Sequence, residues 1–127
     1  MFNIPVSNAE LIDKITILVI KQEKIKDNEK LKHINNELKY LTKFLDELKL
    51  KFDLESKIIE LKTINLKLWN IEDDIRTKEK NKEFDSQFIE LARSVYITND
   101  ERAKTKLEIN TLTKSELIEV KSYEKYN

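Results

Sequence analysis

The chain has 127 residues, and its 24 Lys and Arg side chains balance its 24 Asp and Glu side chains. This balance gives no general attraction to nucleic acid or to anionic membranes, so we expect neither as a partner. The absence of cysteine excludes disulfides and thiol catalysis, and the absence of glycine excludes the glycine-rich phosphate loops of nucleotide-binding proteins.

The first predicted helix begins after Ser7, a good N-cap residue, and Glu10 lies three positions later, where it would complete a capping box. Val6 and Leu11 have the spacing of a hydrophobic staple. Apolar residues recur on a broad face over 11–25, so we expect this helix to be central in the core. Its apolar run is too short to cross a bilayer of about 30 Å, and no signal-peptide pattern is present, which predicts a soluble, cytoplasmic protein.

The second predicted helix begins near Asn28 and carries one uninterrupted seam of the coiled-coil type. The seam has alternating steps of three and four: Leu31, Ile34, Leu38, Leu41, Leu45 and Leu48. The third predicted helix runs from about Asp53 to Lys80 and continues the heptad pattern, but Asn65 and Glu72 fall on its apolar stripe. At ~1.5 Å per residue it would be ~40 Å long, which leaves apolar surface for a partner chain. We therefore expect a homo-oligomer, most simply a dimer.

The fourth predicted helix begins after the N-cap Asp85 and reaches Asn110. Its stripe starts apolar and then turns polar, in the order Ala92, Val95, Tyr96, Asn99, Arg102 and Lys106. The tail over 110–127 has no clear period, and both a short helix and an extended strap remain open. Short connections make successive helices antiparallel, so the sequence predicts a single all-α domain over 1–127. Its architecture would be an up-down bundle of about four helices with long coiled-coil-like arms.

Antiparallel pairing brings the polar parts of helices one, three and four to similar depths. Facing helices of a bundle are a usual place for a binding site. The region would contain Asp13, Lys14, Lys21, Asn65, Trp69, Glu72, Asp73, Arg76, Arg93, Tyr96, Asn99, Asp100, Arg102 and Lys106.

Two interpretations of this cluster remain open. As a site, it would bind a small anionic, nucleotide-like metabolite through Lys14, Lys21, Arg102 and Lys106, with Trp69 or Tyr96 for stacking. As a scaffold, Asn65 would set the register, and Glu72 with Arg93 and Asp100 with Lys104 would form salt bridges. The only histidine, His33, lies off the apolar seam, and no catalytic triad or tight metal motif is present, so we expect no metal or cofactor. Whether the chain is an enzyme is left open.

Four segments resemble a family of short bacterial and phage proteins known only as a domain of unknown function. They are "IPVSNAELIDKITILVIKQEKI" (4–25), "LWNIEDDIRTKE" (68–79), "FDSQFIELARSVYITNDERAKTKLEIN" (84–110) and "VKSYEKY" (120–126). The family's phrases coincide here with nearly all of the cluster residues, Asn65 being the exception. Asn8 and Lys114 stand near positions where several relatives have glycine. The resemblance implies that the cluster is not accidental but supplies no activity. We favour a non-catalytic helical module that assembles with itself or a partner, with a small-ligand protein or enzyme as the alternative.

Overall fold

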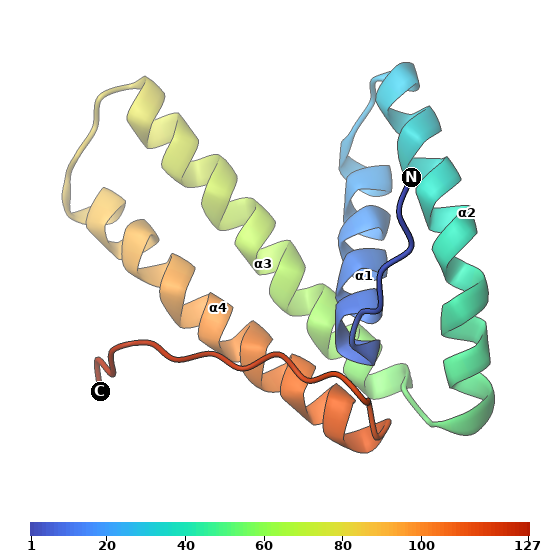
Figure 1. The fold of residues 1–127 in the computed structure, drawn as a ribbon. Coiled ribbons are helices and arrows are strands. Elements are labelled where there is room, and N and C mark those ends of the chain that lie inside the picture. Colours follow the sequence, from blue (N-terminus) through green and yellow to red (C-terminus); the bar gives the residue numbers. More distant parts are fainter.

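The computed structural model describes all residues from Met1 to Asn127 and contains four helices and no strand. With 74% of its residues helical, the structure confirms the all-α prediction. The helices pair as two hairpins, α1 with α2 and α3 with α4 (Figure 1). Their bounds are α1 (Asn8–Lys24), α2 (Asn28–Lys51), α3 (Glu55–Lys80) and α4 (Ser86–Leu112).

Side-chain caps begin three of the four helices. The Ser7 hydroxyl accepts a hydrogen bond from the Glu10 backbone N–H, and Asp27 and Asp85 cap α2 and α4 in the same way. These caps satisfy N–H groups that have no partner within the helix. Helix α3 begins slightly later than its sequence suggests, because the buried Leu54 occupies the N-cap position and makes no side-chain cap.

The two hairpins meet at one end of the molecule and diverge toward their turns, so that the fold is an open V (Figure 1). Helix α1 packs against each of the other three helices, which confirms its predicted central position. The backbone of α2 comes close only to that of α1, and Glu23 near the end of α1 pairs with Lys62 of α3 at 2.8 Å. The main apolar core lies where the hairpins meet and consists of Ala9, Ile12, Ile15, Leu45, Leu54, Leu61 and Ile109.

Both termini extend from the closed end of the V. Residues 1–6, here called the N-terminal arm, run along α1 and α2, and residues 116–127, the C-terminal strap, run back along α4 (Figure 1). The backbone of neither segment makes a hydrogen bond to another backbone group. The strap follows Lys114, whose φ of 53° lies in the left-handed region that favours glycine. An extended strap is thus the observed form of the tail. None of the helices has both the length and the apolar character needed to cross a membrane.

Candidate functional site

The centre of the polar cluster is Asp13 on α1, whose side chain is only 1% exposed. The Arg102 guanidinium from α4 donates from Nε to Oδ1 at 3.0 Å and from Nη2 to Oδ2. The Asn65 amide from α3 donates to the same Oδ1 at 2.9 Å and to the Thr16 hydroxyl at 3.0 Å. One buried carboxylate thus joins three helices. The hydrogen bonds that Arg102 donates to this carboxylate raise the pKa of the guanidinium further, so Arg102 stays charged.

Lys106 forms the second part of the cluster, and its side chain is only 10% exposed. Its ammonium group lies 2.8 Å from the Glu10 carboxylate, 3.1 Å from that of Glu119 and 3.9 Å from that of Asp13. Burial acts to lower the pKa of Lys106, but the three carboxylates outweigh it and the net pKa is raised. In turn, the Lys106 hydrogen bond lowers the pKa of Glu119. The group is therefore a charged lysine enclosed by acids from α1 and from the strap.

A third set of contacts joins α3 to α4 beside the cluster. Lys57 pairs with Glu60 at 3.2 Å on its own helix and with Glu108 across the hairpin. The Thr105 hydroxyl donates to the Glu60 carboxylate at 3.0 Å. The hydrogen bond from Lys57 lowers the pKa of Glu60 most, and the hydrogen bond from Thr105 lowers it to a smaller extent. These contacts fix the register of the hairpin.

The start of α1 is bound to the end of α4. The Ala9 N–H donates to Asn110 Oδ1 at 2.8 Å, and the Asn8 side-chain amide donates to the Thr113 hydroxyl at 3.0 Å. The Asn8 N–H donates to the Ser115 hydroxyl at 3.1 Å. Buried Asn110 thus supplies an acceptor for a helix N-terminus that is covered by protein.

The structure separates the sequence-predicted cluster into an inner and an outer group. The inner group is Asp13, Asn65, Arg102 and Lys106, which are in mutual contact. In the outer group, Lys14 is turned toward α2 and pairs with Glu37 at 3.4 Å. The other nine side chains lie apart from this inner contact: Lys21 and Trp69 are partly buried, whereas Glu72, Asp73, Arg76, Arg93, Tyr96, Asn99 and Asp100 are exposed.

The salt bridges considered for the outer group do not form as expected. Glu72 pairs with Arg76 on its own helix at 3.5 Å, not with Arg93, because both side chains face away from the neighbouring helix. Arg93 pairs with Glu90 at 3.1 Å. The C-terminal strap reaches the outer group where the Tyr126 hydroxyl donates to Asp100 at 2.8 Å and its ring packs edge-on against Tyr96. Asp100 therefore contacts the strap and not Lys104.

Comparison with protein families gives one match. The chain matches a family of unknown function, DUF6165, over residues 2–126. The chain belongs to this family. No curated protein and no solved structure matches it. The match confirms the resemblance drawn from the sequence and extends it to nearly the whole chain, but it assigns no activity.

In this member of the family, two residues of the cluster were missed by the sequence interpretation. Glu10 was assigned to a capping box, but its carboxylate pairs with Lys106, since an ion pair is stronger than a bond to an N–H group. Glu119 lies in the strap, where no period indicates which side chains face the protein. The only sequence signal for the Glu10–Lys106 pair was position along the helix axes, because antiparallel pairing of helices one and four places residue 10 near the level of residue 106.

The inward stripe of α4 also differs by one position from its prediction. The buried positions are Thr98, Thr105, Lys106, Ile109 and Asn110, and Asn99 is exposed. The Thr98 hydroxyl is buried and has no hydrogen-bond partner. The polar stripe of α4 therefore begins with a threonine that packs as an apolar residue.

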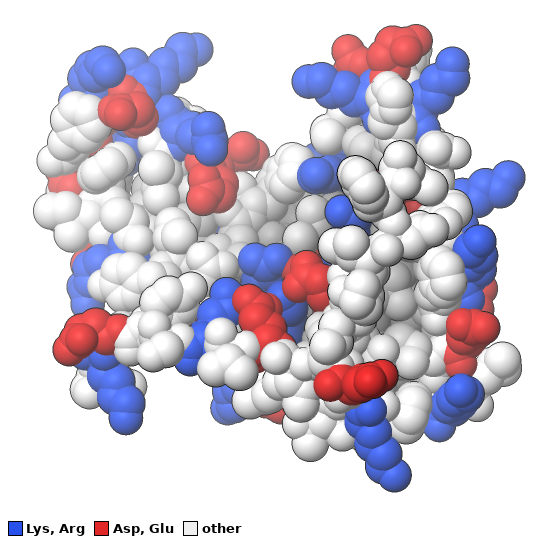
Figure 2. All heavy atoms as spheres, in the orientation of Figure 1, with Lys and Arg blue, Asp and Glu red and all other residues white.

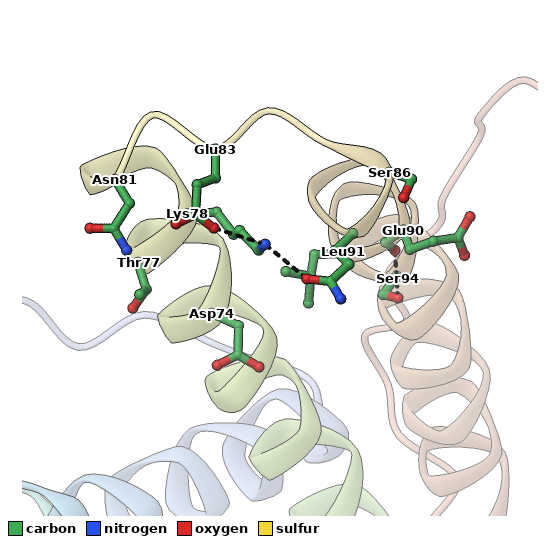
Figure 3. A pocket seen from close by; sticks show the side chains of 10 residues that line it. Asp74, Thr77, Lys78, Asn81, Glu83, Ser86, Glu90, Leu91 and Ser94 are labelled. Carbon is green, nitrogen blue, oxygen red and sulfur yellow. Dashed lines mark hydrogen bonds and ion pairs between the residues drawn. The ribbon is translucent and has the colours of Figure 1, made fainter.

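A second polar region lies at the turn between α3 and α4, around a hollow of about 540 Å³ (Figure 3). Lys78 donates to Glu83 at 3.1 Å, to Asp85 at 3.0 Å and to Gln87 at 2.8 Å. The hydrogen bond to Asp85 raises the pKa of Lys78 most, and the hydrogen bond to Glu83 raises it to a smaller extent. These bonds hold the turn closed. No group of three or more His, Asp or Glu side chains in the structure is placed to hold a metal ion.

Proposed function

We propose that the chain is a non-catalytic helical module that assembles with a second copy of itself. The observation that carries this proposal is an apolar groove of about 770 Å³ between the N-terminal arm and α2. Nine of its 17 lining residues are hydrophobic, and the large side chains of the arm are exposed beside it. Exposed apolar surface of this kind is typical of interaction sites.

The polar cluster supports an assembly role more than a ligand site. Arg102 is held by Asp13, and Lys106 is held by Glu10 and Glu119, so each cation already has a carboxylate of the chain. On the face that Figure 2 shows, both charge signs are mixed, without a broad region of one sign. An anionic ligand would have to displace buried Asp13, and leaving that carboxylate unpaired is costly. The cluster is best explained as the connection between the two hairpins.

A homodimer also suits the open shape. The outer face of α2 is covered by no other helix, and Tyr40, Phe44 and Leu50 are exposed on it. The charged residues around the groove have both signs, so a second copy meets no net repulsion there. Twofold dimers are the commonest assemblies of soluble proteins, which makes the dimer the simplest form of the proposal.

The oligomeric state tests the proposal directly. Sedimentation velocity and small-angle scattering at tens of micromolar should give the mass of a dimer, since ordinary dimers persist at such concentrations. A monomer alone under these conditions would overturn the proposal. A thermal-shift screen with nucleotides, sugar nucleotides and divalent metals should leave the melting temperature unchanged. A clear stabilisation by one of them would instead favour a small-ligand function.

A further inference from the structure

We infer that, in a dimer, the N-terminal arm of each copy stays as one wall of its own arm–α2 groove and inserts its exposed side chains into the arm–α2 groove of the other copy. This inference rests on the proposed self-assembly and names the surface that carries it. It assigns a binding role to residues 1–6, to which the sequence interpretation gave none beyond the helix staple.

The arm has the properties of an inserted segment. Phe2 is 94% exposed and Ile4 is 72% exposed, although burial of such apolar side chains is favourable. Pro5 restricts the backbone, and this restriction lowers the entropy lost when the arm is held extended. Pro5 also has no N–H donor that would need a partner. The arm is therefore an extended apolar segment whose side chains are not covered by its own chain.

The groove presents a second stripe of α2, distinct from the seam that faces α1. The stripe has alternating steps of three and four: Glu37, Tyr40, Phe44, Glu47 and Lys51. The Tyr40 and Phe44 rings meet edge to face with centroids 6.2 Å apart, and the Lys43 ammonium lies 4.5 Å from the centre of the Tyr40 ring. Both residues remain partly exposed, Tyr40 at 44% and Phe44 at 39%. The groove thus offers an ordered aromatic surface to an apolar side chain.

The position of the arm favours reciprocal insertion between two copies over binding of another partner. The arm forms one wall of the groove, so the inserting segment and the receiving surface are contiguous on one face. A twofold axis beside this wall would let each arm enter the other groove at the same time, as an isologous interface requires.

The charges at the rim support the same occupant. The rim contains Glu10, Lys14, Glu37, Glu47 and Lys51, with Lys14 and Glu37 already paired at 3.4 Å. An anionic lipid surface or a nucleic acid would be attracted by a cationic rim, which this groove lacks. A second copy carries the same mixture of signs and is compatible with it.

Substitution of the arm tests the inference. The double variant Phe2→Ser with Ile4→Ser changes only exposed side chains and should leave the helical content unchanged. We expect it to raise the dimer dissociation constant at least tenfold, whereas Val120→Ser with Tyr123→Ser, a comparably exposed pair in the C-terminal strap, should leave it within about twofold. Sedimentation over a concentration series measures both constants.

Cross-linking gives a second measurement. The chain has no cysteine, so an Ile4→Cys chain mixed with a Glu47→Cys chain can form a disulfide only between copies. The mixture should give more cross-linked dimer than either chain alone. A monomeric wild type would overturn the proposed function itself. A wild-type dimer that is unaffected by the arm substitutions would overturn only the reciprocal insertion of the arms. Binding of the wild type to neutral phosphatidylcholine vesicles, lost in the arm variant while dimerisation persists, would assign the arm to a lipid surface and overturn it as well.

Discussion

The Arg102 guanidinium holds the Asp13 carboxylate through two of its nitrogens, and this ion pair connects the α3–α4 hairpin to the α1–α2 hairpin. Asp13 is buried on α1, the helix that contacts all the others. An ion pair in such a position contributes little over an apolar pair, but loss of one member leaves a buried charge. Its role is to fix how the two hairpins meet.

Arg102→Ala should therefore destabilise the fold by ~3–5 kcal/mol, because it leaves buried Asp13 without its guanidinium. Urea unfolding followed by far-UV circular dichroism measures the change in the free energy of unfolding. The matched control is Arg93→Ala on the same helix, whose exposed pair with Glu90 should contribute nothing measurable. Equal stabilities of the two variants would contradict a structural role for Arg102 and favour the ligand interpretation.

Asn65→Ala should cost ~1.5–3 kcal/mol, since the Asn65 amide donates one hydrogen bond to the Asp13 carboxylate. Asn70 on the same helix is exposed and makes no side-chain hydrogen bond, so Asn70→Ala is the control and should leave stability unchanged. Thermal and urea unfolding report both values. If Asn65→Ala were as stable as the control, the register of α3 against α1 would be set by apolar packing alone.

The C-terminal strap should be released in acid. The pKa of Glu119 is lowered by its hydrogen bond with Lys106, so the folded carboxyl binds its proton at lower pH than the unfolded one. The stabilisation is therefore complete above the ordinary glutamate pKa and is lost as the pH falls through the lowered value. Backbone ¹⁵N relaxation should show residues 116–127 ordered near neutral pH and mobile in acid.

Glu119→Gln should produce the mobile strap already at neutral pH, without changing the unfolding of the helices, because Glu119 is partly exposed. The control is Glu124→Gln, which makes no ion pair and should behave as the wild type. A strap that stays ordered in Glu119→Gln would show that the Tyr126 contacts with Tyr96 and Asp100 are sufficient to hold it.

Local signals in the sequence predicted the helices well. Ser7 and Asp85 begin α1 and α4 as expected, because a cap depends on a few neighbouring residues. Helix pairing within each hairpin was also accessible, since it follows from connection length, but α2 and α3 do not pair although a short connection joins them. Antiparallel pairing also places residues 13 and 102 at similar depths. The contacts among Asp13, Asn65 and Arg102 agree with this depth.

The partner of Glu10, the divergence of the hairpins and the inward face of α4 depended on interactions that no local sequence pattern encodes. Glu10 fits a capping box in isolation, but the buried Lys106 offers it a stronger partner. The divergence of the hairpins follows from α2 having only α1 beside it, which periodicity alone does not reveal. Asn99 was assigned inward by a stripe that began at Ala92, whereas the buried position is the neighbouring Thr98. A one-residue difference of this kind turns a side chain by about 100° around the helix.

Thr98 and Thr105 provide a matched pair for the last prediction. Both are on the inward face of α4, with exposures of 0% and 2%. The Thr98 hydroxyl has no hydrogen-bond partner, whereas the Thr105 hydroxyl donates to the Glu60 carboxylate. A buried hydroxyl without a partner is destabilising, so its replacement by a methyl group of the same shape should be favourable.

Thr98→Val should therefore stabilise the fold by ~1 kcal/mol, and Thr105→Val should destabilise it by ~0.5–1.5 kcal/mol because it removes the hydrogen bond to the partly exposed Glu60 carboxylate. Valine and threonine have similar helix propensities, so this difference in sign reports the hydrogen bonds and not the backbone. Urea unfolding of the two variants under identical conditions measures it. If both substitutions were destabilising to the same extent, the Thr98 hydroxyl would have to be hydrogen-bonded in solution, contrary to the structure.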